Sequence, residues 1–227
     1  MLLAVALAPS ASLQAAEESA LYGQLSVGAV TAADLRNDNA AATAVFSPKT
    51  GWGAEGTLGY RAMPALRLEL NVGHRRHGMD GSFARNARIA CGSPMIPCLS
   101  GDVDGGRLAA SSALVSAKWD VPLGETLTPY IGAGAGLTRL SLRGTTTGTV
   151  TAGQSQSVLL IDDRDTVAAY RVGAGVSIQL RSVKVVLDYT YMLSAKTDLA
   201  GDVPAAAFTI HDRFRSHAIS IGAQFPF

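Results

Sequence analysis

The sequence predicts an all-β fold: a transmembrane antiparallel up-and-down β-barrel of eight strands, with four long extracellular loops and three short periplasmic turns. Three observations lead to this expectation. Apolar residues alternate with polar or small ones in eight segments, and the connections between the segments alternate between long and short. The composition is 48% hydrophobic and only 16% charged, yet no window holds the roughly 18 consecutive apolar residues that a spanning helix needs.

The alternation of side chains is the main evidence for strands. In residues 66–73 (LRLELNVG), leucine or valine stands at every second position and a polar or small residue stands between. A period of two belongs to a β-strand, whose side chains point to opposite faces in turn. Seven further segments repeat the pattern and begin near Leu21, Trp52, Ala113, Ile131, Tyr170, Val183 and His217. Leu114 is an apolar exception on the otherwise polar face of its segment.

The connections give an independent signal. They fall at residues 32–49, 62–65, 78–106, 122–127, 144–165, 181–182 and 195–212, and long ones alternate with short ones throughout. Outer-membrane barrels have short turns on the periplasmic side and longer loops on the outside. A soluble eight-stranded barrel has no reason to segregate loop length in this way, so the pattern favours a membrane barrel.

The aromatic residues indicate which face of the strands meets lipid. A soluble, lipocalin-like cup would turn the apolar face inward and leave the charged face in water. The apolar face carries many large rings, which would crowd a lumen only eight strands wide. Several of them stand near strand ends, as an interfacial aromatic girdle requires. The predicted girdle consists of Trp52, Tyr60, Trp119, Tyr170, Tyr189 and Tyr191.

The N-terminus predicts export. Residues 1–8 form a short apolar run, Pro9 interrupts it, and small residues lead to Ala16, which is typical of a secretory signal peptide over residues 1–16. The positive n-region is absent, which leaves the true start of the signal peptide open. The barrel domain is expected over residues 17–227. The net charge of +1 provides no basic footprint for nucleic acid.

Two cysteines, Cys91 and Cys98, lie in a polar and glycine-rich stretch of the longest connection. In an exported protein this spacing predicts a disulfide that closes a small loop. A metal site would need more ligands nearby, and none is placed for it. We therefore expect neither a metal nor a cofactor.

The polar face of the predicted strands carries charges of both signs, which we expect to meet in the lumen. Buried charges are tolerated when they are paired, so these residues predict a hydrogen-bonded network that plugs the barrel. The same residues could line a narrow pore, although eight strands leave a lumen that side chains about fill. The predicted network consists of Glu55, Glu69, Lys118, Asp120, Arg171, Lys184 and Asp188.

Two short motifs suggest further contacts. The sequence HRRH (74–77) stands where a strand enters a long connection, and either a basic rim against anionic lipid headgroups or plain solvation explains it. Ser216, His217 and Ser220 invite a hydrolase interpretation. Residues 216 and 217, like 217 and 220, point to opposite faces of a strand, and no third orienting group accompanies them. We expect no catalytic residues.

Several segments resemble a known family. The sequences TPYIGAGAGLTRL (128–140), AAYRVGAGVSIQL (168–180), VVLDYTYM (185–192) and the terminal phenylalanine are similar to the opacity-protein and outer-membrane-protein-A type of eight-stranded barrel, a group of porin-like surface antigens. The resemblance covers most of the chain from about Leu21. It implies that the terminal aromatic strand is read by the barrel-assembly machinery. The residues of that signal are Ile219, Ile221, Ala223, Phe225 and Phe227.

These expectations define a function class. The chain is expected in the outer membrane of a Gram-negative bacterium as a monomer, in contact with outer-membrane lipid and lipopolysaccharide and with no enzymatic activity. Its role is expected to be structural or interactive, through loops that contact an extracellular ligand or a host surface. A narrow passive pore and an enzyme that modifies lipid A stay open as alternatives.

Overall fold

The computed structural model describes residues 20–38, 42–85, 100–121, 123–124, 126–150, 154–180, 183–203 and 206–227. The predicted signal peptide (1–16), Cys91 and Cys98 lie outside these ranges. Among the described residues, no helix is long and apolar enough to span a membrane. The chain forms ten strands: β1 (Leu21–Ala32), β2 (Leu35–Asp38), β3 (Ala42–Pro48), β4 (Gly51–Met63), β5 (Leu66–Arg85), β6 (Ser100–Asp120), β7 (Leu127–Val150), β8 (Gln154–Leu180), β9 (Val183–Val203) and β10 (Ala206–Pro226).

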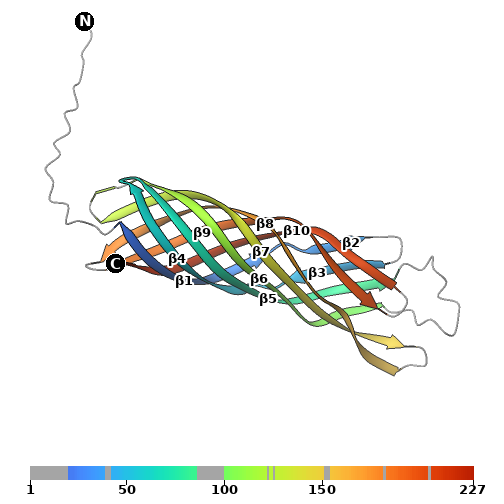
Figure 1. Ribbon diagram of the computed structural model, residues 1–227. Helices are drawn as coiled ribbons and strands as arrows, with labels where there is room; N and C mark the ends of the chain where they lie inside the picture. The colour runs from blue at the N-terminus through green and yellow to red at the C-terminus, as the bar shows by residue number, and fades with distance from the viewer. Residues whose placement is uncertain are drawn as a thin grey trace, which may run out of the picture.

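The strands form a closed ring. Each strand from β4 to β10 pairs antiparallel with its neighbours, β1 joins β4 to β10, and the pairing of β5 with β6 closes the sheet. The two short strands extend this ring beyond β1 and β4, because β2 pairs with β3 and β3 pairs with β5. The ten strands therefore make the predicted eight-stranded up-and-down architecture, with its first two strands each interrupted once (Figure 1). The predicted fold class is confirmed.

The register of the ladders sets the tilt of the strands. A row of paired residues that starts at Leu66 on β5 passes through Trp119 and Ile131, crosses β8, β9, β10, β1 and β4, and returns to β5 at Arg76. It returns ten residues further along β5 than it began, which is the shear of this barrel. A shear slightly above the strand number gives the strong tilt, about 35–45°, that is typical of membrane barrels.

The long connections contain more strand than the sequence pattern predicts. Residues 32–49, 78–106, 144–165 and 195–212 are largely taken up by β2 and β3 and by the ends of β5 to β10. The ladders shift register within or beside three of these stretches, for example between Met79 and Ser82 and between Asp104 and Arg107. Each shift changes the face to which the following residues point. The period-two pattern is thereby lost, although the strand continues.

Because the strands are longer than a membrane-spanning strand, the barrel has two parts along its axis. The apolar band is the zone whose outward side chains are large and exposed, among them Leu25, Val27, Leu58, Leu70, Val115, Ile131, Val172, Leu187 and Ile221. The projecting half is what lies beyond it on the side away from the C-terminus: β2, β3 and residues 76–85, 100–110, 139–150, 154–168, 193–203 and 206–215. Figure 1 shows the hairpin of β7 and β8 reaching furthest at this end.

The interior changes character between the two parts. Within the band the inward side chains are mostly polar or glycine, whereas an apolar core fills the interior of the projecting half. Leu114, the exception on the polar face of its segment, is 1% exposed and belongs to this core. The core consists of Leu35, Ala44, Phe46, Met79, Leu108, Ala110, Leu114, Leu140, Leu142, Ile161, Ala169, Met192, Leu199, Ile210 and Phe214.

Candidate functional site: the interior of the barrel

Glu69 lies at the centre of the polar interior. β5 turns it inward between Arg67 and Asn71, and its side chain is fully buried. One carboxylate oxygen accepts a hydrogen bond from the Tyr22 hydroxyl at 2.6 Å, and the other lies 3.1 Å from Nζ of Lys118 and accepts from Asn71 at 3.2 Å. Arg67 adds a second cation at 3.5 Å. A carboxylate removed from water is stabilised only by this kind of multiple pairing.

Arg67 links Glu69 to the periplasmic end of the lumen. Its Nε and Nη2 donate to Asp120 Oδ1 at 3.0 and 2.7 Å. The Tyr130 ring lies 4.7 Å from both the Arg67 guanidinium and Nζ of Lys118, which places it between two cations. The Tyr130 hydroxyl donates to Asp188, whose other partners include Lys118 at 3.9 Å. Charged side chains from β5, β6 and β9 and tyrosines from β1 and β7 therefore meet in one connected group.

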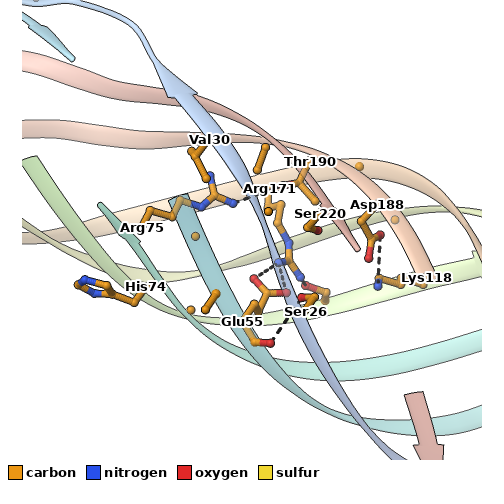
Figure 2. A pocket seen from close by; sticks show the side chains of 18 of the residues that line it. Ser26, Val30, Glu55, His74, Arg75, Lys118, Arg171, Asp188, Thr190 and Ser220 are labelled. Atoms are coloured by element: carbon orange, nitrogen blue, oxygen red, sulfur yellow. Dashed lines mark hydrogen bonds and ion pairs between the residues drawn. The ribbon is translucent and has the colours of Figure 1, made fainter. Parts of the chain in front are cut away.

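A second ion pair lies nearer the projecting half. Nη1 of Arg171 donates to both carboxylate oxygens of Glu55, at 2.8 and 2.6 Å, and Nη2 donates to Ser116 at 3.0 Å. Figure 2 shows this pair crossing the lumen from β8 to β4, with the Lys118–Asp188 pair further along. An arginine that is buried here is thus bonded to a carboxylate and a hydroxyl, as buried charge requires.

Arg75 is the last charged side chain before the apolar core. It is 8% exposed and donates to hydroxyl groups, Ser216 Oγ at 2.5 Å and Thr190 Oγ1 at 3.3 Å. A cavity of about 50 Å³ lies beside it, and Arg171 and Asp188 also line this space. Since one water needs at least about 10–15 Å³, such a cavity holds a few water molecules. Beyond it the interior is the packed apolar core.

The structure brings six of the seven predicted lumen charges together in ion pairs near the middle of the lumen: Glu55, Glu69, Lys118, Asp120, Arg171 and Asp188. Lys184 has the same inward parity but is half-buried at the periplasmic end of β9. Sequence reasoning left out Arg67, although its alternation placed it on this face. It also missed Tyr22 and Tyr130, because the predicted network was drawn from charged residues only and a tyrosine on the polar face gives no such signal.

The HRRH motif divides between the two faces of β5. His74 and Arg76 point outward and are exposed, whereas Arg75 and His77 point inward and are buried. Strand alternation alone produces this division. A rim role can therefore apply to His74 and Arg76 only, and Figure 2 shows His74 directed away from the cavity.

The hydroxyl and imidazole groups of β10 do not form a catalytic pair. Ser216 and Ser220 lie on the inward side, while His217 is exposed on the outer face, where its Nδ1 is 2.7 Å from the Tyr189 hydroxyl. The Ser216 hydroxyl accepts a hydrogen bond from Arg75. In the part of the chain that the structure describes, no group of three or more His, Cys, Asp or Glu residues could hold a metal ion.

The predicted girdle and the terminal strand lie on the outer surface. Trp52, Tyr60, Trp119, Tyr170 and Tyr189 are each between 46% and 57% exposed, and Tyr191 is half-buried. Residues 216–226 of β10 pair with β1, and the Phe227 N–H donates to the Leu21 carbonyl at 3.2 Å. The Phe227 ring covers Gly23, where an added Cβ would lie 2.7 Å from the ring. The remaining signal residues Ile219, Ile221, Ala223 and Phe225 line the same seam.

The wall of the projecting half has a seam between β8 and β9. Their ladder stops at the pair of Ile161 with Gly201 and resumes only at Ala169 with Ser194. In the gap, Asp165 Oδ2 accepts from the Asp198 N–H and the Thr197 hydroxyl, both at 2.9 Å, and Asp163 accepts from the Ala200 N–H at 2.7 Å. The amide of Asp198, helped by Thr197, lowers the pKa of the Asp165 carboxyl.

One histidine lies inside the projecting half. His77 is fully buried against the edge of the Phe214 ring, and its Nδ1 is 3.0 Å from the Lys49 carbonyl oxygen. Its Nε2 has no hydrogen-bond partner among the described residues. Burial lowers the pKa of this imidazole, and the nearby Arg75 cation acts in the same direction, against the Lys49 carbonyl. The ring is therefore neutral at pH 7.

Comparison with known proteins agrees with this geometry. The chain matches the family model for the outer membrane protein beta-barrel domain over residues 1–227. It therefore belongs to the family of outer membrane β-barrel proteins and is located in the outer membrane of a Gram-negative bacterium. Among curated proteins no match was found.

Several solved structures share the fold. OprG from Pseudomonas aeruginosa is 13% identical with a TM-score of 0.52, and the alignment covers 92% of this chain and 98% of that one. The outer membrane protease OmpT from Escherichia coli is 10% identical with a TM-score of 0.52, covering 91% and 96%. A major outer membrane protein from Thermus thermophilus is 11% identical with a TM-score of 0.50, covering 92% and 100%. At these identities the likeness concerns the fold alone.

Proposed function

We propose that this protein is a closed, monomeric outer-membrane barrel without enzymatic activity, which holds rigid hairpins outside the cell for contact with an extracellular ligand or a host surface. The projecting half is the observation that carries this proposal. A tilted strand needs about 9–11 residues to cross the membrane. Strands β5 to β10 have between 20 and 27 residues, so about half of each is available outside the bilayer.

The interior of the projecting half supports a rigid stem. Phe46, Phe214, Leu140 and Leu142 are each 0% exposed and pack in the middle of the hairpins rather than facing a channel. Apolar side chains removed from water contribute roughly 1.5–3 kcal/mol each, enough to hold four hairpins together without lipid around them. The tips of those hairpins are then presented at a fixed height above the membrane.

The lumen supports closure. Within the apolar band the charges are paired, on neighbouring strands as in Glu69 with Lys118 and across the lumen as in Glu55 with Arg171. Beyond them the apolar core follows directly. An ion on its way through would have to break buried ion pairs and then enter a dry apolar region, both of which cost several kcal/mol. This is the argument against the narrow pore.

The enzyme alternative has less support. Modification of lipid A by an acyl-transfer mechanism needs a nucleophile and a base in hydrogen-bond reach of each other. Ser216 and His217 point to opposite sides of the barrel wall. The protease named among the structural neighbours is similar in fold only.

Single-channel recording in planar bilayers tests the closed lumen. We expect no steady ohmic conductance from the folded protein. The variant Glu69→Ala should raise the frequency of openings, because Lys118 loses its nearest carboxylate and Arg67 loses one of its two. Steady conductance of the unaltered protein that changes with Arg171→Ala would contradict the closed-barrel proposal and favour the pore.

Surface contact is tested on whole cells. Replacing residues 86–99 by a glycine–serine linker of equal length should reduce attachment of expressing cells to an epithelial monolayer, while the protein keeps its heat-dependent shift on cold gel electrophoresis. The control replaces the residues of a shorter tip, 151–153, by a glycine–serine linker of their own length. Unchanged attachment after all four tips are replaced would contradict a surface-contact role.

Three sequence features extend the proposal. Residues 1–16 are removed on export, Cys91 and Cys98 form a disulfide in the longest hairpin tip, and the strand that ends at Phe227 addresses the chain to the barrel-assembly machinery. The exposed apolar face of β10, with Ile219 and Ile221 about 60% and 57% exposed, supports the last of these. A polar tail added after Phe227 should impair insertion, and normal insertion would count against it.

A further inference from the structure

The outer surface of β5 to β8 is strongly basic just beyond the apolar band. Five arginines, Arg76, Arg107, Arg139, Arg143 and Arg164, point outward there and are exposed. We call this surface the cationic face. The one acidic side chain described in the same three rows of residues is Asp162, which is 3.8 Å from Arg143. Four net positive charges thus gather on one side of a chain whose total net charge is +1.

The strand register arranges these arginines around small side chains. Arg76 on β5 is followed across the sheet by Ala109, Ser141 and Arg164. The row below contains His74, Ser111, Arg139 and Thr166, and the row above contains Gly78, Arg107, Arg143 and Asp162. Neighbouring strands are about 4.8 Å apart, and Arg139 lies one row below Arg76. The two arginines are therefore separated by about 12 Å of surface that carries small, hydroxyl-bearing side chains. Long guanidinium side chains from both sides can reach one group between them.

Electrostatics within the protein does not explain the arrangement. Arg107 and Arg143 are direct cross-strand partners, and like charges at such positions repel. Arg76, Arg107, Arg139 and Arg164 have no acidic partner in the described part of the chain. Arg36 and Lys49, also in the projecting half, do have acidic partners: Arg36 pairs with Asp34 at 3.1 Å and Lys49 with Asp80 at 2.9 Å. An external anion would relieve the repulsion on the cationic face.

The height of the cationic face identifies the anion. Arg76 is the cross-strand partner of Trp52, and Tyr170 lies six residues below Arg164 on β8. Exposed tryptophan and tyrosine rings of a membrane barrel lie at the level of the lipid headgroups. Arg76 and Arg139 are thus at the headgroup level on the extracellular side, and Arg107, Arg143 and Arg164 stand one step further out.

We propose that the cationic face binds the phosphate groups of a phosphorylated glycolipid headgroup in the outer leaflet, as in lipopolysaccharide. Arginine donates two parallel hydrogen bonds to phosphate oxygens, and its charge is well matched to a phosphate that is partly shielded from water. Arg76 and Arg139 hold the phosphate nearest the acyl chains, with Ser111 between them as a further donor. This inference goes beyond the proposed function, because it concerns the lipid around the stem and not the hairpin tips.

Binding of purified lipopolysaccharide to the folded protein in detergent micelles tests the proposal. The double variant Arg76→Gln/Arg139→Gln should bind at least tenfold more weakly than the unaltered protein, and the difference should shrink at high salt. The matched control, Arg36→Gln/Lys49→Gln, removes the same charge from paired cations of the projecting half and should leave binding within about twofold. Both variants must keep the heat-dependent gel shift.

The ligand can be altered in the same assay. Lipopolysaccharide from which the lipid A phosphates have been removed should bind the unaltered protein and the Arg76→Gln/Arg139→Gln variant equally weakly. Inorganic pyrophosphate at the same phosphate concentration should not displace the lipid. Equal binding of the intact lipid by the double variant, an equal loss in the control, or displacement by pyrophosphate would overturn the proposal; the last result would assign the face to a soluble anion.

Discussion

The two halves of the barrel are built from the same strands with opposite polarity. In the apolar band the outer face is apolar, and the interior holds Glu69, Arg67 and Asp120 in ion pairs. In the projecting half the outer face carries arginines and the interior holds Phe214 and the other core residues. The medium outside the barrel wall therefore determines which side chains fill its interior. Where lipid surrounds the strands, apolar side chains go outward; where water surrounds them, the same strands need a core of their own.

The largest expected effect concerns the buried ion pairs of the band. Replacing Glu69 by alanine removes the nearest carboxylate of Lys118 and one of the two carboxylates around Arg67, and it leaves buried Lys118 with Asp188 at 3.9 Å. This should lower the free energy of unfolding by about 3–5 kcal/mol. The matched control is Asp80→Ala, which breaks the Lys49–Asp80 pair whose side chains are 59% and 63% exposed. That change should cost less than about 1 kcal/mol. Urea unfolding in lipid vesicles measures both, and equal costs would contradict the contrast.

The apolar core of the projecting half should be nearly as sensitive. Phe214→Ala should destabilise that half by about 3–5 kcal/mol, because it leaves a cavity in a packed interior. The control on the same strand is Ile219→Ala, which is 60% exposed towards lipid and should cost much less. Limited proteolysis of the folded protein should then cut the hairpins of the Phe214 variant while the band stays protected. Protection of both halves would mean that the core is not needed.

Acid should weaken the projecting half through His77. Burial lowers the pKa of this imidazole, so the unfolded chain binds its proton at a higher pH than the folded chain. Stability is therefore unaffected well above about pH 6.5, the unfolded value, and falls as the pH drops below it. His77→Leu should flatten the dependence of the unfolding midpoint on pH between pH 7.5 and 5. An unchanged slope in the His77→Leu variant would contradict this role of the buried imidazole.

The smallest expected effect concerns the seam between β8 and β9. The amide of Asp198 lowers the pKa of Asp165, so its hydrogen bonds stabilise the folded state above about pH 4 and are lost as the pH falls through the depressed value. Asp165→Asn should cost about 1 kcal/mol locally, given the exposure of the site. Hydrogen exchange should become faster at the amide of Asp198 and not at that of Gly201, which stays in the ladder. Uniform exchange along β9 would show that the seam is not held by this carboxylate.

Alternation predicted the fold and much of the site. A period of two identified the strands of the band and put Glu55, Glu69, Lys118, Asp120, Arg171 and Asp188 on one face. It could not predict which charge meets which, because partners such as Tyr22 and Glu69 are 47 residues apart and meet only through the register and the tilt. Arg75 was assigned to a rim motif for the same reason, since its inward direction follows from parity but its partners come from β9 and β10.

The sequence by itself determined what the strands must do in lipid: their number, their apolar outer face and the shorter connections at one end. These features follow from local chemistry, because each residue of a membrane strand faces either lipid or the lumen. The tertiary structure alone decided where the strands end, since a register shift such as that beside Met79 hides the alternation beyond the membrane. It also decided that Arg76, Arg139 and Arg107, from three strands, lie together on one face, because only the shear of the closed barrel fixes their relative heights.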